Sequence, residues 1–463
     1  MDLSALHKEK EQDHYNYYGD TILQQPSLDR EQTPLSVACA YVNAHTTSVV
    51  LESRASINIA RGGMPCFEAC VHGRVDITAK ALVTAHALVD STYDATTTAQ
   101  IIASEKGHVG IVEYLINADA ALDMLTTNDG SSALMLASQN GHVLVVEHLI
   151  KAGAALNLQT TNNGSSALMM ASLKGHILVV EHLIKAGATL DLQTTNDGSS
   201  ALMMASQNDH LLVVEHLVKA GAAVDLQTTD NGSSALIMAS DNGDVLVVEH
   251  LIKAGAAVNL QTTDYGLSAL HIASQNGHVG VVKHLIKAGA AVDLQTTDNG
   301  LSALMLACHE GHVGVVKHLI KARATLGLKM TDNGMTALIA ASKNGHIGVV
   351  ETLIKAGTAI DVHCNNGRSA LFYAFHNAHA ANLIQLLIDY GADFNEVDKP
   401  AFIQSRRRTG AMTFAELSER VRRGKEEKAN IFTAIRQQRD IIPELWDVVM
   451  LYTKIPGYVE HTW

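Results

Sequence analysis

The apolar residues of this chain follow a pattern that returns every 34 residues. In the period 126–159, the first apolar run is Leu134–Ala137 and the second is Val145–Ile150, with a glycine between them. The second run places apolar residues at i, i+1, i+4 and i+5, which is one face of a helix. The pattern therefore predicts two short helices in each period, and neither is long enough to form a core alone.

The repetition extends over most of the chain. One dipeptide, Ala-Leu, marks the same place in eight periods, at Ala133, Ala167, Ala201, Ala235, Ala269, Ala303, Ala337 and, one residue short, Ala370. A period of 20 to 50 residues is typical of a solenoid, in which neighbouring repeats bury each other's apolar faces.

Residues with special backbone preferences divide each period into elements. Asn128-Asp129-Gly130 predicts a tight turn, and Ser132 is placed to cap the first helix. Gly141 and Gly153 fit the left-handed position that ends a helix. Each unit is thus expected to be a turn, a helix, a second turn, a helix and an extended segment.

These residues resemble the ankyrin repeat, whose pattern is G-x-T-P-L-H-x-A-A-x-x-G-H followed by a Val/Leu-rich helix and G-A. The match is clear at Gly266-Leu267-Ser268-Ala269-Leu270-His271-Ile272-Ala273-Ser274 and Gly277-His278, and Thr33-Pro34-Leu35 keeps the family's Thr-Pro-Leu. The resemblance implies an all-α ankyrin-repeat solenoid of helix-turn-helix units joined by β-hairpin loops. Nine units begin near residues 98, 132, 166, 200, 234, 268, 302, 336 and 369.

The units depart from that pattern in one respect that bears on rigidity. The family's His is a methionine at Met135, Met169, Met203 and Met305. The Thr–His hydrogen bond of the family is then missing, so these units are expected to be less rigid.

The period also divides the chain. We expect a flexible lead-in at residues 1–31, degenerate repeats at 32–97, the regular array at 98–398 and a basic helical segment at 399–463. Thr413-Phe414-Ala415-Glu416 in the last segment is a capping-box pattern before a helix. This segment is either a worn capping repeat or a separate C-terminal helical extension.

Charge and cysteine content limit the function classes. The net charge is −13, divided into +4 in residues 399–463 and −17 in the rest. An acidic array argues against nucleic-acid binding, which needs a basic face. Five cysteines that do not follow the repeat indicate a reduced, intracellular protein. We expect it in the cytoplasm, with nuclear import through Arg406-Arg407-Arg408 as an alternative.

Candidate catalytic and metal residues have structural explanations. Most of the 24 histidines form two ladders copied with the repeat, one after the glycine (His142 and its copies) and one in the second helix (His148 and its copies). His309-Glu310-Gly311-His312 has the wrong spacing for a zinc-protease motif, and Cys66, Cys70 and His72 lie in a degenerate repeat. Phosphate-loop, dinucleotide and nucleophile-elbow motifs do not occur. We expect no enzyme, no cofactor and no metal.

The resemblance implies a monomeric binding or scaffold module that holds a partner protein on the concave face, along hairpin tips and first helices. The alternative is a regulatory or effector protein whose array targets an activity carried by residues 399–463. The candidate hot spot has an apolar centre of three hairpin residues, namely Leu267, Leu301 and Met335. These side chains are either exposed for binding or packed against the adjacent hairpin. Its candidate rim comprises the first-helix residues Asp241, Gln275, His309, Glu310 and Lys343.

Overall fold

The secondary structure of the chain follows the 34-residue period. The structure is a computed structural model that describes residues 69, 71–75, 92–93, 97–376 and 381–392. Contacts between residues divide the chain into two units, Met1–Ala223 and Val224–Trp463. The expected lead-in at 1–31 and the expected helical segment at 399–463 lie outside the described residues, as does most of 32–97.

The first unit contains four described repeats, each with a first and a second helix. Its helices are α6 (Ala99–Lys106), α7 (Val109–Asn117), α8 (Ala133–Gln139), α9 (Val143–Ala152), α10 (Ala167–Lys174), α11 (Ile177–Lys185), α12 (Ala201–Gln207) and α13 (Leu211–Lys219). Before α6, the strands β1 (Thr92–Tyr93) and β2 (Thr97–Thr98) pair antiparallel.

The second unit contains five described repeats of the same form. Its helices are α14 (Ala235–Asn242), α15 (Val245–Lys253), α16 (Ala269–Gln275), α17 (Val279–Lys287), α18 (Ala303–Glu310), α19 (Val313–Lys321), α20 (Ala337–Asn344), α21 (Ile347–Lys355), α22 (Ala370–His376) and α23 (Ala381–Asp389). The bridges Gln227↔Ser234, Gln261↔Ser268 and Gln295↔Ser302 close its hairpins.

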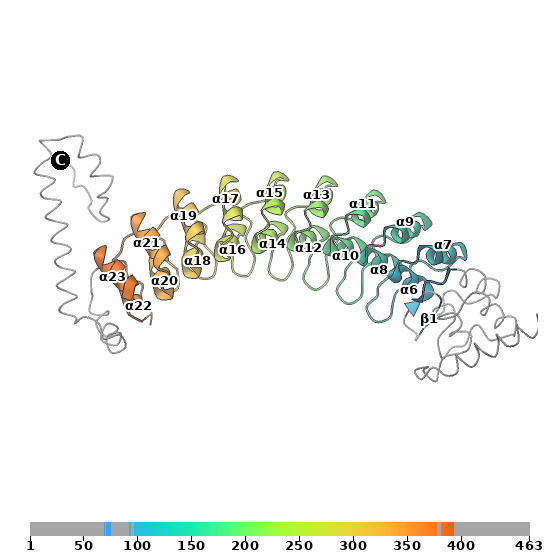
Figure 1. The fold of residues 1–463 in the computed structure, drawn as a ribbon, viewed down its shortest axis with the longest axis horizontal. Coiled ribbons are helices and arrows are strands. Elements are labelled where there is room, and N and C mark those ends of the chain that lie inside the picture. The colour runs from blue at the N-terminus through green and yellow to red at the C-terminus, as the bar shows by residue number, and fades with distance from the viewer. Residues whose placement is uncertain (1–68, 70, 76–91, 94–96, 377–380, 393–463) are drawn as a thin grey trace, which may run out of the picture. The chain divides into compact units, whose positions relative to one another are not determined.

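Within each unit the helices form two rows (Figure 1). First helices pack on first helices, as α8 on α10 and α16 on α18, and second helices pack on second helices, as α9 on α11 and α17 on α19. The core lies between the rows, where Val145, Val146 and Leu149 are completely buried. The predicted all-α solenoid is confirmed.

The predicted helix ends are confirmed as well. The Ser132 hydroxyl accepts a hydrogen bond from the Met135 amide at 3.3 Å and caps α8. Gly153 follows α9 with a φ of 92°, in the left-handed region that glycine tolerates best.

The histidines of the first ladder connect adjacent repeats. His176 donates its Nε2–H to the carbonyl of Gln139 in the preceding first helix at 3.0 Å. The ring passes so close to Gly141 that a Cβ there would meet it at 2.7 Å, and Gly141 has a φ of 74°. The Gly-His pair is therefore a contact between neighbouring repeats, which explains its copying.

Methionine replaces the family's histidine, and its sulfur still contacts the N-cap residue of the first helix. The Ser132 amide donates to Sδ of Met135 at 3.4 Å, and the same contact recurs at Met169 and Met203. The prediction that the Thr–His bond is absent from these repeats is correct, but the sulfur accepts a weak hydrogen bond in its place.

Candidate functional site

The predicted rim residues lie in one row of the second unit. Asp241, Gln275, His309 and Lys343 occupy equivalent positions near the C-terminal ends of α14, α16, α18 and α20. Each is exposed, as is Glu310 beside His309. The structure thus brings together all five predicted rim residues in successive first helices that pack on one another.

Backbone hydrogen bonds hold this row in a fixed register. The carbonyls of Asp241, Gln275 and His309 each accept the Nε2–H of the histidine one repeat later, at 2.8–2.9 Å. Asn276 adds a hydrogen bond from Nδ2 to the Asp241 carboxylate at 2.8 Å. The exposed side chains therefore project from preorganised positions, which reduces the ordering cost of binding.

The two histidines of the sequence His309–His312 have separate partners. His309 Nδ1 contacts Glu310 Oε1 at 2.8 Å, whereas His312 lies beyond the turn and donates to the Gln275 carbonyl. In the second ladder, His148 donates Nδ1–H to the Leu144 carbonyl of its own helix at 2.7 Å. Among the described residues, no group of three His, Cys, Asp or Glu side chains could hold a metal ion.

The predicted apolar centre is wrong in its exposure. Met335 is only 9% exposed, and Leu267 and Leu301 are half-buried. The cause is their place in the hairpin: the amide of Leu267 donates to Thr262 Oγ1 at 2.9 Å and its carbonyl accepts from the Thr262 amide at 2.9 Å. A residue paired across the hairpin base, directly before the helix cap, turns inward. Ser131 at the same position of the first unit is likewise buried.

An exposed aromatic side chain lies close to these residues in the chain. Tyr265 is at the tip of the hairpin before α16, and its side chain is 55% exposed. Its backbone is fixed, because its carbonyl accepts from the Thr297 amide of the next hairpin at 3.0 Å. The described sister hairpins carry only polar residues here, namely Asp129, Asn163, Asp197, Asn231, Asn299 and Asn333. This substitution is the signal that sequence reasoning missed.

Exposed leucines on second helices of the first unit were also missed. Leu144, Leu178 and Leu212 are the second residues of α9, α11 and α13 and are 54–57% exposed. They lie outside the helical face of Val145, Val146, Leu149 and Ile150, so the period marks them as exposed, but no role was assigned to them.

Two titratable residues in the first helices are buried. Burial lowers the pKa of His271 against the opposing effect of the Leu294 and Leu301 backbone, and burial raises the pKa of the Cys308 thiol. Cys308 is therefore a protonated thiol inside α18, and a buried thiol of this kind is inert. The exposed side chains of the row, by contrast, are charged or can form hydrogen bonds, which suits them to recognition.

Comparison with known families identifies the repeats. A family model described as ankyrin repeats (3 copies) matches residues 67–160, 146–230, 202–298, 236–329 and 304–398. The chain belongs to the ankyrin-repeat family. Ankyrin repeats generally mediate interactions between proteins. A search of curated proteins found no match. None of the helices in the described part of the chain is long and apolar enough to cross a membrane.

Proposed function

We propose that this chain is a non-catalytic binding or scaffold module that holds a partner protein along the hairpin tips and first-helix ends of α14–α20. The observation that carries the proposal is Tyr265, an exposed aromatic residue on a fixed hairpin of the unit that also carries the row of exposed polar and charged residues. The Asp, Gln, His, Glu and Lys side chains of that row lie at the C-terminal ends of the first helices of this unit and would supply the polar part of the interface.

Tyrosine is well suited to anchor such a surface. Tyr, Trp and Arg dominate the binding energy of protein interfaces, while surrounding polar contacts exclude water and set specificity. Tyr265 replaces the Leu267, Leu301 and Met335 group as the anchor that we propose. The five rim residues keep the role predicted from the sequence.

The same surface supports a binding role in preference to catalysis. On this surface, the His309 side chain lies next to Glu310. The backbone carbonyls of the row accept hydrogen bonds from the neighbouring repeat. Cys308 and Cys364 are buried as free thiols, which supports an intracellular setting. We therefore propose the cytoplasm as its location, and we propose separately that the protein acts as a monomer.

The test is the substitution Tyr265→Asn, which introduces the residue found at Asn231 and Asn299. Thermal unfolding should be unchanged, because the sister hairpins fold with Asn at this position. Affinity for a partner captured from extracts of the source cells should fall at least about tenfold, the loss expected for an aromatic hot spot. Tyr390→Asn, a change of equal chemistry at another exposed tyrosine, is the matched control. Equal affinity of both variants and the wild type would refute the proposed site.

A further inference from the structure

The second helices of the second unit carry a charge pattern that the proposed function does not use. Position five of the second helix is a glutamate in six described repeats, at Glu113, Glu147, Glu181, Glu215, Glu249 and Glu351. In α17 and α19 this residue is a lysine, Lys283 or Lys317. The two helices with a lysine at this position are neighbours and pack on each other.

The exchange removes an ion pair and leaves a cation in its place. In α15 and α21, the glutamate pairs with a lysine one turn later, Lys253 to Glu249 at 2.9 Å and Lys355 to Glu351 at 2.5 Å. In α17 and α19, the later residues are Lys287 and Lys321, so both positions are basic. Within the described part of the chain, none of these four lysines forms an ion pair.

Helix energetics explain only half of these lysines. Lys287 and Lys321 lie in the last turn, where a cation offsets the helix dipole, and most sister helices have a lysine there. Lys283 and Lys317 lie one turn earlier, where the like charge four residues away is unfavourable. The helix dipole and the neighbouring charge of the same helix do not account for them; Lys317 has Glu351 of the next second helix within electrostatic reach.

A fifth cation follows α19 at a strained position. Arg323 has a φ of 65°, in the left-handed region, where sister repeats have Gly289 or Gly357. Space is available there, since a Cβ at Gly289 or Gly357 would meet nothing within 4 Å. An exposed arginine in place of the favoured glycine is a conformational cost of the kind that clusters at functional sites.

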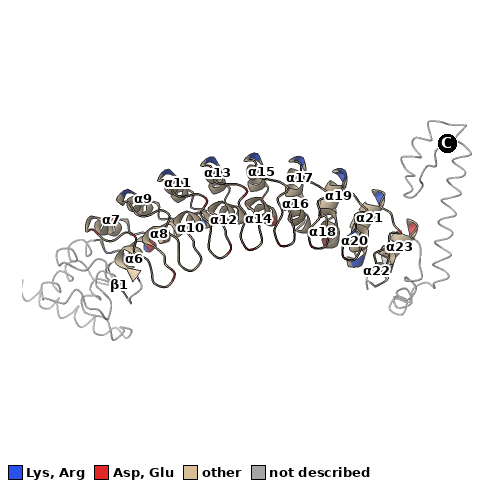
Figure 2. Ribbon diagram, turned by 180° about the vertical axis from the view of Figure 1, so that it is seen from behind, with Lys and Arg blue, Asp and Glu red and all other residues tan. Residues whose placement is uncertain are grey.

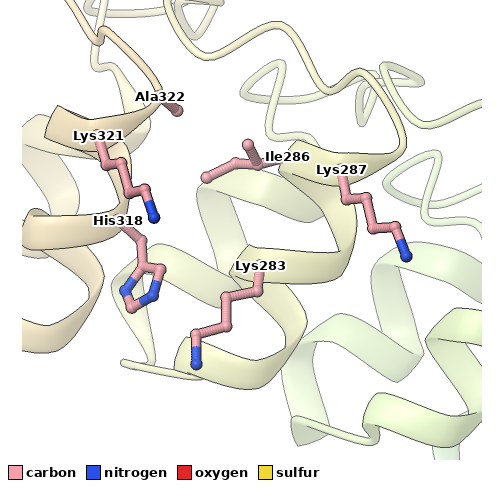
Figure 3. Close-up of a pocket in the computed structure, with 6 residues that line it drawn as sticks. All are labelled: Lys283, Ile286, Lys287, His318, Lys321 and Ala322. Carbon is pink, nitrogen blue, oxygen red and sulfur yellow. The ribbon is translucent and has the colours of Figure 1, made fainter.

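A hollow of about 270 Å³ lies between the two helices (Figure 3). Figure 3 shows Ile286 of α17 pointing toward α19, where Lys321 and His318 approach it, with Lys283 on the near side of α17. Ile286 and Ala322 supply apolar lining, and the exposed lysines surround it. Small-molecule sites usually enclose about 300–1,000 Å³, so this open hollow is better suited to one side chain of a larger partner.

We propose that this hollow, with Lys283, Lys287 and Lys321 in its lining and with Lys317 and Arg323 next to its α19 lining residues in the chain, binds an acidic protein segment that inserts one apolar side chain against Ile286. Charge complementarity argues for an acidic ligand. The acidic segment must be short, because glutamates border the basic surface on both sides. Glu249 on α15 lies within electrostatic reach of Lys287, and Glu351 on α21 lies within electrostatic reach of Lys317. At about 8–10 Å per packed helix, the basic surface is too narrow for a lipid surface or a long nucleic acid.

This site is separate from the surface around Tyr265. It lies on second helices, whereas Tyr265 and the rim residues belong to hairpins and first helices. Figure 2 shows Lys and Arg at the ends of the second helices, on the side away from the hairpins. The two sites can therefore be disabled independently.

The test measures binding of the full chain to a synthetic peptide of one Leu flanked on each side by four Glu. The variant Lys283→Glu/Lys317→Glu restores the glutamates of sister repeats, and an ion pair like that of Glu249 and Lys253 should keep it folded. We expect its affinity for the peptide to fall at least tenfold. The matched control, Lys151→Glu/Lys185→Glu, changes the net charge equally on α9 and α11 and should bind as the wild type does.

Two further measurements examine the hollow itself. Replacing the peptide's Leu by Ala, or Ile286 by Ala in the protein, should weaken binding about threefold to tenfold. Arg323→Gly should raise the melting temperature and weaken peptide binding, a combination that a purely structural residue would not give.

Equal affinity of the wild type and the Lys283→Glu/Lys317→Glu variant would overturn the proposal. If the control variant also lost binding, the loss would be due to the change in net charge, and the proposal would be overturned as well. Tighter binding of inorganic phosphate, phosphatidylserine vesicles or a single-stranded oligonucleotide than of the peptide would replace the acidic segment by that ligand. Binding of the Tyr265 partner should be unchanged in the lysine variant, so failure of one site does not mimic failure of the other.

Discussion

Position 271 shows how one side chain changes the chemistry of a repeat. In α16 the histidine accepts from Ser268 at Nδ1, 2.8 Å from the hydroxyl, and donates from Nε2 to the Leu294 carbonyl at 2.9 Å. Both ring nitrogens are thus used by the neutral tautomer. At the sister positions Met135, Met169 and Met203 a sulfur fills this place and does not titrate.

The buried imidazole predicts a dependence of stability on pH. Burial lowers the pKa of His271 in the folded protein, so below the ordinary value of about 6.5 the unfolded chain binds more protons. The stability contributed by His271 is complete above that value. It is lost as the pH falls toward the lowered folded pKa.

His271→Met removes this titrating group while keeping the residue of the sister repeats. At pH 8 it should cost about 1 kcal/mol for the lost hydrogen bond. Between pH 8 and pH 5.5 the wild type should lose more stability than the variant in urea unfolding. Parallel losses in the two proteins would show that His271 is not the titrating group.

At the scale of one helix, α10 and its N-cap residue include two buried serines with opposite roles. Ser166 caps the helix and accepts from the Met169 amide at 3.4 Å. Ser172 is completely buried, and no hydrogen-bond partner for its hydroxyl exists among the described residues. The same serine recurs in most repeats, where the family pattern has alanine.

Ser172→Ala should therefore stabilise the protein by about 1 kcal/mol, because an unsatisfied buried hydroxyl is removed. Ser166→Ala should destabilise it by about 0.5–2 kcal/mol through loss of the cap. Chemical unfolding measures the stability of both variants. Each variant is the control for the other, because both replace a serine by alanine. A loss of stability in both would mean that Ser172 is hydrogen-bonded after all.

The helices also show which features a sequence can predict. Ser132, Gly141 and Gly153 each act through the local backbone, so their positions gave the helix ends correctly. The inward turn of Met335 depends on how the hairpin folds at its base, and the position in the hairpin alone suggested exposure. Tyr265 was missed because a single change at a turn leaves no periodic signal, although comparison of the repeats reveals it.

At the scale of the whole molecule, the repeated framework separates stability from recognition. Buried residues such as Val145 and Val146 are copied in almost every unit, while exposed positions differ between repeats. Changes in surface residues therefore leave the core unaltered. Both proposed sites of the second unit, on its hairpins and on its second helices, follow from such local differences.

The central claim is that a partner protein binds the hairpins and first-helix ends of α14–α20. The most direct measurement places a photo-cross-linking amino acid at position 265 or 275, with position 178 on α11 as the exposed control, and exposes each protein to extract from the source cells. We predict a covalent adduct with the same partner at 265 and 275 and none at 178. Adducts at 178 alone, or of equal yield at all three positions, would contradict the account.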